Sequence, residues 1–129
     1  MTTIQEIDRD DQGDPPPGST ALVQRCVRLR RKPLGQFTAE DLRVMLGQEI
    51  AVPILLPLAV AALGKDPLAE GDLYPGDLLV AALSLPASAW TARQRDRDRL
   101  LAAVDPDDAE LPRAVRDTVL AARGQQVRR

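Results

Sequence analysis

The stretch that organises this sequence is Asp66-Pro67-Leu68-Ala69-Glu70-Gly71-Asp72-Leu73-Tyr74-Pro75-Gly76-Asp77-Leu78-Leu79. It holds two prolines, two glycines and four acidic residues. Proline fixes φ and glycine admits positive φ, so we expect a rigid connection that leaves one helix near Gly64 and starts another at Pro75. Two interpretations stay open at this point: a well-specified turn with solvated acids, or an acidic recognition surface.

Four residues of this stretch are the candidate partner-binding residues: Glu70, Asp72, Tyr74 and Asp77. We expect the turn to hold the three carboxylates close together and Tyr74 to anchor the turn on the core. Three carboxylates could also bind a divalent cation, but their spacing matches no calcium loop. Asp77 also falls in the first turn of a predicted helix, where acids are favoured without any metal. We therefore expect no metal ion and no cofactor.

The length of 129 residues predicts one domain with a single modest core. The first 18 residues are polar, acidic and rich in proline, which predicts a disordered tail over residues 1–18. Residues 19–124 are predicted to form a helical domain, and residues 125–129 a flexible C-terminal tail. Because Phe37, Tyr74 and Trp90 are the only aromatic residues, the core must be largely aliphatic.

Apolar residues recur at helical spacing through residues 19–124, and no segment alternates with the period of a strand. The predicted class is all-α, a compact bundle of about five to six short helices. Thr38 is the expected N-cap of the second helix, with Asp41 completing a capping box. The third helix is apolar on every side and is therefore expected to be the central one. The predicted helix starts are Ser19 or Thr20, Thr38, Pro53 or Ile54, Pro75, Pro86 and Leu111.

The residues used most often in catalysis are nearly absent. The chain has no histidine, the commonest general base and metal ligand, and no glycine-rich phosphate loop. Cys26 lies on the apolar stripe of the first predicted helix, which favours an inert core thiol over a nucleophile. We therefore expect a protein that binds rather than an enzyme.

Charge and cysteine content narrow the possible partners further. With 17 basic and 19 acidic residues the net charge is −2, which argues against a general nucleic-acid binder. A single cysteine fits a reducing compartment, and no secretory signal is visible at the N-terminus. The longest apolar run, residues 50–63, is shorter than a membrane span needs. These features predict a cytosolic protein without a membrane partner.

One alternative function stays open: a small regulatory protein that binds nucleic acid through the basic surface Arg25–Lys32 of its first helix. In that case affinity should fall steeply with salt concentration. The mixed-charge run Arg93–Arg99 could assist, but its interleaved aspartates favour a solvated helix face with i,i+3 ion pairs.

Several pieces of this sequence resemble the contact-dependent growth inhibition (CDI) immunity proteins. The most specific is Glu70-Gly71-Asp72-Leu73-Tyr74-Pro75-Gly76-Asp77-Leu78-Leu79. The supporting pieces, in order, are Leu29-Arg30-Arg31-Lys32-Pro33-Leu34, Phe37-Thr38-Ala39-Glu40-Asp41-Leu42-Arg43, Gly47-Gln48, Pro57-Leu58-Ala59 and Trp90. The resemblance spans roughly residues 22–91, and it departs from the family pattern at Ala51-Val52-Pro53, where a glycine and a bulkier stretch without proline are usual.

This resemblance implies a cytosolic antitoxin. Its partner would be the C-terminal toxin domain of a cognate delivered effector, often a nuclease. The shared motif positions carry no assigned interface, because they can serve the fold while variable surface residues determine which toxin is bound.

Overall fold

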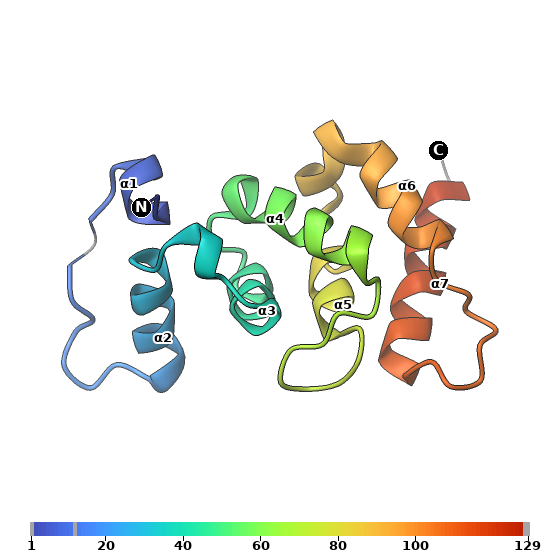
Figure 1. Ribbon diagram of the computed structural model, residues 1–129, viewed down its shortest axis with the longest axis horizontal. Coiled ribbons are helices and arrows are strands. Elements are labelled where there is room, and N and C mark those ends of the chain that lie inside the picture. Colours follow the sequence, from blue (N-terminus) through green and yellow to red (C-terminus); the bar gives the residue numbers. More distant parts are fainter. Residues whose placement is uncertain (1, 12, 128–129) are drawn as a thin grey trace.

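The computed structural model describes residues 2–11 and 13–127, with residues 125–127 as backbone only. The described chain is all-α, as predicted, and contains no strand (Figure 1). Its α-helices are α1 (Ile4–Asp8), α2 (Ala21–Arg30), α3 (Ala39–Gly47), α4 (Val52–Lys65), α5 (Asp77–Leu83), α6 (Gln94–Ala102) and α7 (Arg113–Val127). Two 3₁₀ helices, η1 (Leu34–Gln36) and η2 (Ala87–Arg93), precede α3 and α6.

The first two predicted helix starts are confirmed by their capping bonds. Thr20 caps α2, because its hydroxyl oxygen accepts the amide of Val23 at 3.2 Å. Thr38 and Asp41 form a capping box at the start of α3. The Thr38 hydroxyl accepts the Asp41 amide at 3.1 Å, and the Asp41 carboxylate accepts the Thr38 amide at 3.0 Å. These short-range bonds satisfy amides that have no partner within the helix.

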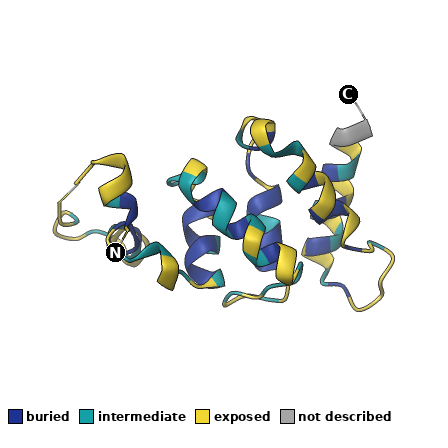
Figure 2. Cartoon of the chain, turned by 45° about the horizontal axis from the view of Figure 1, so that its top comes forward, coloured by how far each residue is buried: buried dark blue, intermediate teal, exposed yellow. Residues whose placement is uncertain are grey.

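The central helix is α5, not the apolar third helix α4 that the sequence suggested. Five of the seven residues of α5 are buried, and α5 packs against α3, α4 and α7. Trp90 fixes the far end of this helix, because its indole N–H donates to the Ala82 carbonyl at 3.0 Å inside the core. Only four of the fourteen residues of α4 are buried. Figure 2 shows the buried residues gathered on the helices in the middle of the molecule.

The N-terminal segment differs from the predicted disordered tail. Residues 4–8 form α1, and the Ile4 side chain is fully buried. The Leu34 amide donates to the Thr2 carbonyl at 2.8 Å, and Arg30 pairs with Asp8 at 2.7 Å. One buried isoleucine and one ion pair therefore fold this segment onto α2, whereas the average composition of residues 1–18 indicated no core contact.

The C-terminal helices also begin and end at other residues than predicted. The helix predicted from Pro86 is two elements, η2 and then α6. The last helix begins at Arg113 because Pro112 disfavours the helical conformation at Leu111. It continues to Val127, past the predicted end at Gly124, so the first part of the predicted flexible tail is helical and residues 128–129 lie outside the described residues. No helix in the described ranges combines the length and the hydropathy that a membrane span requires.

Candidate functional site

The connection between α4 and α5, residues 66–76, is called the acidic loop below, and its own backbone bonds close it at both ends. The Asp66 carboxylate accepts the Leu68 amide at 3.0 Å, and the Asp66 carbonyl accepts the Ala69 amide at 3.0 Å. At the other end the Gly76 amide donates to the Leu68 carbonyl at 3.1 Å. The loop leaves the lower side of the molecule as a wide turn (Figure 1).

Asp77, the first residue of α5, holds the acidic loop from inside. Its side chain is 1% exposed. One carboxylate oxygen accepts the Gly71 amide at 2.6 Å, and the other accepts the Leu73 amide at 3.0 Å. Both oxygens are therefore engaged by backbone donors of the same loop.

Glu40 of α3 binds the amide between those two. Its Oε1 accepts the Asp72 amide at 2.9 Å. The Arg43 guanidinium, one turn later on α3, donates to the same carboxylate from Nε at 2.6 Å and from Nη2 at 2.5 Å. Arg43 Nε also lies 3.7 Å from Asp77 Oδ2. Three consecutive loop amides are thus held by two buried carboxylates, and one arginine lies beside both.

The ion pairs and hydrogen bonds of this network shift the pKa values of its side chains. Hydrogen bonds from Arg43, opposed by burial and assisted by the Asp72 amide and Arg25, lower the pKa of Glu40 from 4.5 to about 2. The same pairing raises the pKa of Arg43. Burial acts to raise the pKa of Asp41, but its bonds from Lys32 and the Thr38 amide outweigh burial and lower it. Glu40 and Asp41 are therefore ionised at neutral pH.

The two glycines of the acidic loop are needed for close packing. A Cβ at Gly71 would lie 2.5 Å from Glu40 Oε1 and 3.2 Å from Glu40 Cα. A Cβ at Gly76 would lie 2.6 Å from Val115 Cγ2 on α7, and the φ of Gly76 is +88°, which favours glycine. The spacing of glycine and acid in the motif therefore follows from the contacts of the loop with α3, α5 and α7.

The four candidate residues all lie on or beside the acidic loop, but they differ in exposure. Glu70 and Asp72 are exposed, and Tyr74 is half-buried and packs against the core. Asp77 is inside the protein, where its carboxylate binds the loop amides. Within the described part of the chain, no three histidine, cysteine or acidic residues are grouped so that they could hold a metal ion.

Glu40 and Arg43 were not among the candidates. In the sequence Glu40 reads as an ordinary acid in the first turn of a helix. The spacing of Glu40 and Arg43, three residues apart on one helix face, was the available signal for their pairing. The contact of Glu40 with the Asp72 amide spans 32 residues, and no local pattern predicts it.

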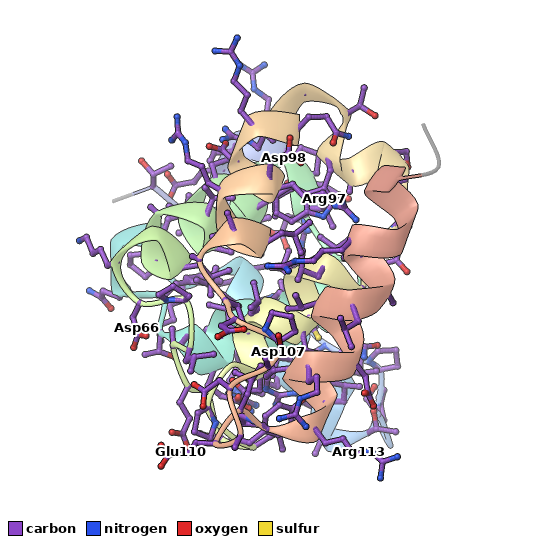
Figure 3. All side chains as sticks on the ribbon, turned by 90° about the vertical axis from the view of Figure 1, so that its right-hand side faces the viewer. Asp66, Arg97, Asp98, Asp107, Glu110 and Arg113 are labelled. Atoms are coloured by element: carbon purple, nitrogen blue, oxygen red, sulfur yellow. The ribbon has the colours of Figure 1, made fainter. Side chains whose placement is uncertain are left out.

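A second acidic segment, residues 105–112 between α6 and α7, is held in a similar way by a basic side chain. The Arg116 guanidinium donates to the carbonyls of Pro106 at 2.9 Å, of Asp108 at 2.8 Å and of Leu111 at 3.5 Å. Figure 3 shows Asp107 and Glu110 of this segment and Asp66 of the acidic loop in the lower half of the molecule. Asp66, Asp107 and Glu110 thus lie toward the same side of the molecule.

The basic surface Arg25–Lys32 is largely neutralised by acidic partners. Arg25 contacts Glu40 at 3.4 Å, Arg30 pairs with Asp8 at 2.7 Å, and Lys32 pairs with Asp41 at 2.5 Å. Arg31 pairs with Asp14 at 3.1 Å. Phosphate binding would have to displace these carboxylates, which weakens the nucleic-acid alternative.

The remaining expectations concern Cys26 and the mixed-charge run. Cys26 is buried and burial raises the pKa of its thiol, as expected of an inert core cysteine. Asp96 pairs with Arg93 at 3.0 Å and lies 4.0 Å from Arg99, the expected i,i+3 pattern. Arg97 differs, because it is buried and its guanidinium reaches the Ala122 carbonyl of α7 at 3.5 Å.

Comparison with known proteins extends this picture. A family model described as CDI immunity proteins matches residues 6–100. The matched region contains the acidic loop together with Glu40, Arg43 and Asp77, and it ends before α7. A search of the curated proteins gave no significant match, and a search of the solved structures gave none. The chain belongs to the family of CDI immunity proteins.

Proposed function

We propose that this chain is a cytosolic immunity protein that binds the toxin domain of its cognate CDI effector and neutralises it, with a nuclease as the class of toxin. It acts by binding alone, with no bond made or broken and no cofactor. Family membership supports a toxin as the partner. One structural observation supports the acidic loop as the toxin-binding surface. Its backbone is fixed by Glu40 and Asp77, while Glu70 and Asp72 face solvent.

A fixed backbone supports binding because it reduces the entropy lost on association. Ordering a mobile loop at an interface weakens affinity, and a loop that is already ordered avoids that cost. Here the amides of Gly71, Asp72 and Leu73 are bonded within the free protein. The carboxylates of Glu70 and Asp72 can therefore meet a partner without rearrangement of the loop.

The charge of this surface supports a basic partner. A nuclease must attract phosphates, so its active site carries lysine and arginine side chains. Carboxylates placed over those side chains would speed encounter and block access of the nucleic acid. In this proposal Glu70 and Asp72 contact the toxin, whereas Tyr74 and Asp77 position the loop that carries them.

The experiment is co-purification with the toxin domain of the polypeptide encoded immediately upstream, together with rescue of cells that express that domain. We expect a stable complex and rescue by the wild-type chain. Charge reversal in Asp72→Lys should weaken binding by about 100-fold, because a like-charge contact costs several kcal/mol. Glu6→Lys, an exposed acid on α1 away from the acidic loop, is the matched control and should bind normally.

Two results would count against this proposal. Absence of a complex and of rescue with the wild-type chain would exclude the immunity function toward that polypeptide. A complex of unchanged affinity in Asp72→Lys and in Glu70→Lys would move the interface away from the acidic loop.

A further inference from the structure

Leu73, at the outer part of the acidic loop, is the most exposed large apolar side chain in the described ranges. Its exposure is 61%, compared with 50% for Leu120, the next in order. Leu73 is neither a core residue nor one of the partly buried residues that pack against the core. The Leu73 side chain is therefore available to a partner.

The backbone that carries Leu73 is fixed. Its own amide donates to Asp77 at 3.0 Å, and the preceding amide, of Asp72, donates to Glu40 at 2.9 Å. Gly71, two residues earlier, is packed against Glu40 so closely that a Cβ would not fit. The leucine is therefore held outward by a rigid support and is not exposed by the chance motion of a loose loop.

Two acidic residues lie within three positions of Leu73 in the sequence. Glu70 and Asp72 are both exposed, and in the part of the chain that the structure describes neither side chain has an ion pair within 4.0 Å. An apolar centre with a charged rim is the arrangement found at protein interfaces, where the centre is desolvated and supplies most of the binding energy. The rim adds charge complementarity and speeds association.

We propose that Leu73 is the apolar anchor of the toxin-binding surface, and that the partner receives it in an apolar pocket rimmed by lysine or arginine side chains. This inference rests on the proposed function and deepens it. It assigns two separate tasks within the acidic loop: Leu73 slows dissociation, and Glu70 and Asp72 speed association.

The test uses the full chain and the toxin domain of the polypeptide encoded immediately upstream, with association and dissociation rates measured at several salt concentrations. We expect Leu73→Ala to raise the dissociation rate by about 10- to 100-fold, with the association rate nearly unchanged. Asp72→Lys should instead slow association and reduce its salt dependence. Leu120→Ala, which removes another exposed leucine on α7, is the control and should leave both rates unchanged.

The outcomes separate this inference from the function on which it rests. Because the Leu73 side chain faces solvent, Leu73→Ala should keep the melting temperature of the wild type, and Leu73→Met should retain slow dissociation. If Leu73→Ala dissociates as slowly as the wild type while Asp72→Lys binds weakly, Leu73 is not the anchor, but the proposed immunity function is retained. If the wild-type chain does not bind the toxin domain, both fail.

Discussion

Glu40 and Arg43 lie one turn apart on α3 and form a bidentate pair, with donor–acceptor distances of 2.6 and 2.5 Å. The carboxylate oxygen nearer Arg43 Nε also accepts the Asp72 amide at 2.9 Å. A pair that is normally a surface feature of a helix here holds a loop 32 residues away in the sequence. The acidic loop therefore depends on α3 as much as on its own turn residues.

Removal of the Glu40 charge should destabilise the protein. We expect Glu40→Gln to lower the free energy of unfolding by about 2–3 kcal/mol, because the Arg43 guanidinium loses its bidentate carboxylate partner in a largely buried site. Urea denaturation followed by circular dichroism measures this change. Glu6→Gln alters an exposed glutamate and should change stability by less than about 0.5 kcal/mol. Equal stability of the two variants would contradict a structural role for Glu40.

Stability should fall in acid through the titration of Glu40. Its pKa in the folded protein, about 2, is below the ordinary value of 4.5, so it contributes stability that is complete above about pH 4.5 and is lost as the pH falls toward 2. The full contribution is about 3 kcal/mol. Asp41, whose pKa is also lowered, adds to the same loss. Denaturation between pH 6 and pH 2 should show a shallower decline for Glu40→Gln, and an equally steep decline would contradict the assignment.

Alanine substitution should have opposite effects on stability at Gly71, which is closely packed, and at Gly47, which is not. Gly71→Ala should destabilise the protein by about 1–3 kcal/mol, because the added Cβ meets Glu40 side-chain and backbone atoms. Gly47→Ala, in α3, meets no atom within 4 Å and should stabilise the protein by up to about 1 kcal/mol through helix propensity. Thermal denaturation of both variants distinguishes these effects. A neutral Gly71→Ala would show that the loop can move away from α3.

Ala51 occupies a backbone conformation that suits glycine. Its φ is 53°, and a non-glycine residue in the left-handed region costs about 1 kcal/mol or more. We expect Ala51→Gly to raise the free energy of unfolding by about 0.5–1 kcal/mol. Ala61→Gly, on the exposed side of α4, should lower it by about 1 kcal/mol, and the same sign for both variants would contradict the explanation.

Local signals predicted the features that depend on neighbours in the sequence. The capping box of Thr38 and Asp41 and the N-cap Thr20 could be identified because cap and recipient lie three residues apart. The apolar spacing predicted the all-α class for the same reason. The acidic stretch was identified as rigid because proline and glycine act on their own backbone.

Features that depend on distant residues could not be predicted in this way. The pairing of Glu40 with the Asp72 amide, the burial of Ile4 and the contact of Arg97 with α7 all join separate elements. Hydrophobicity alone also misplaced the central helix. α4 carries the longer apolar run, but α5 lies between α3 and α7 and is therefore more completely covered.

The measurement that tests the central claim most directly is a calorimetric titration of the upstream-encoded toxin domain with the double variant Glu70→Lys/Asp72→Lys, beside the wild type and Glu6→Lys. Both substituted side chains are exposed, and within the described ranges neither carboxylate forms a hydrogen bond or an ion pair within 4.0 Å, so the helical circular dichroism signal should be retained and the melting temperature nearly unchanged. We predict tight binding by the wild type and by Glu6→Lys, and loss of measurable binding in the double variant. Wild-type affinity in a folded double variant would contradict recognition through the acidic loop.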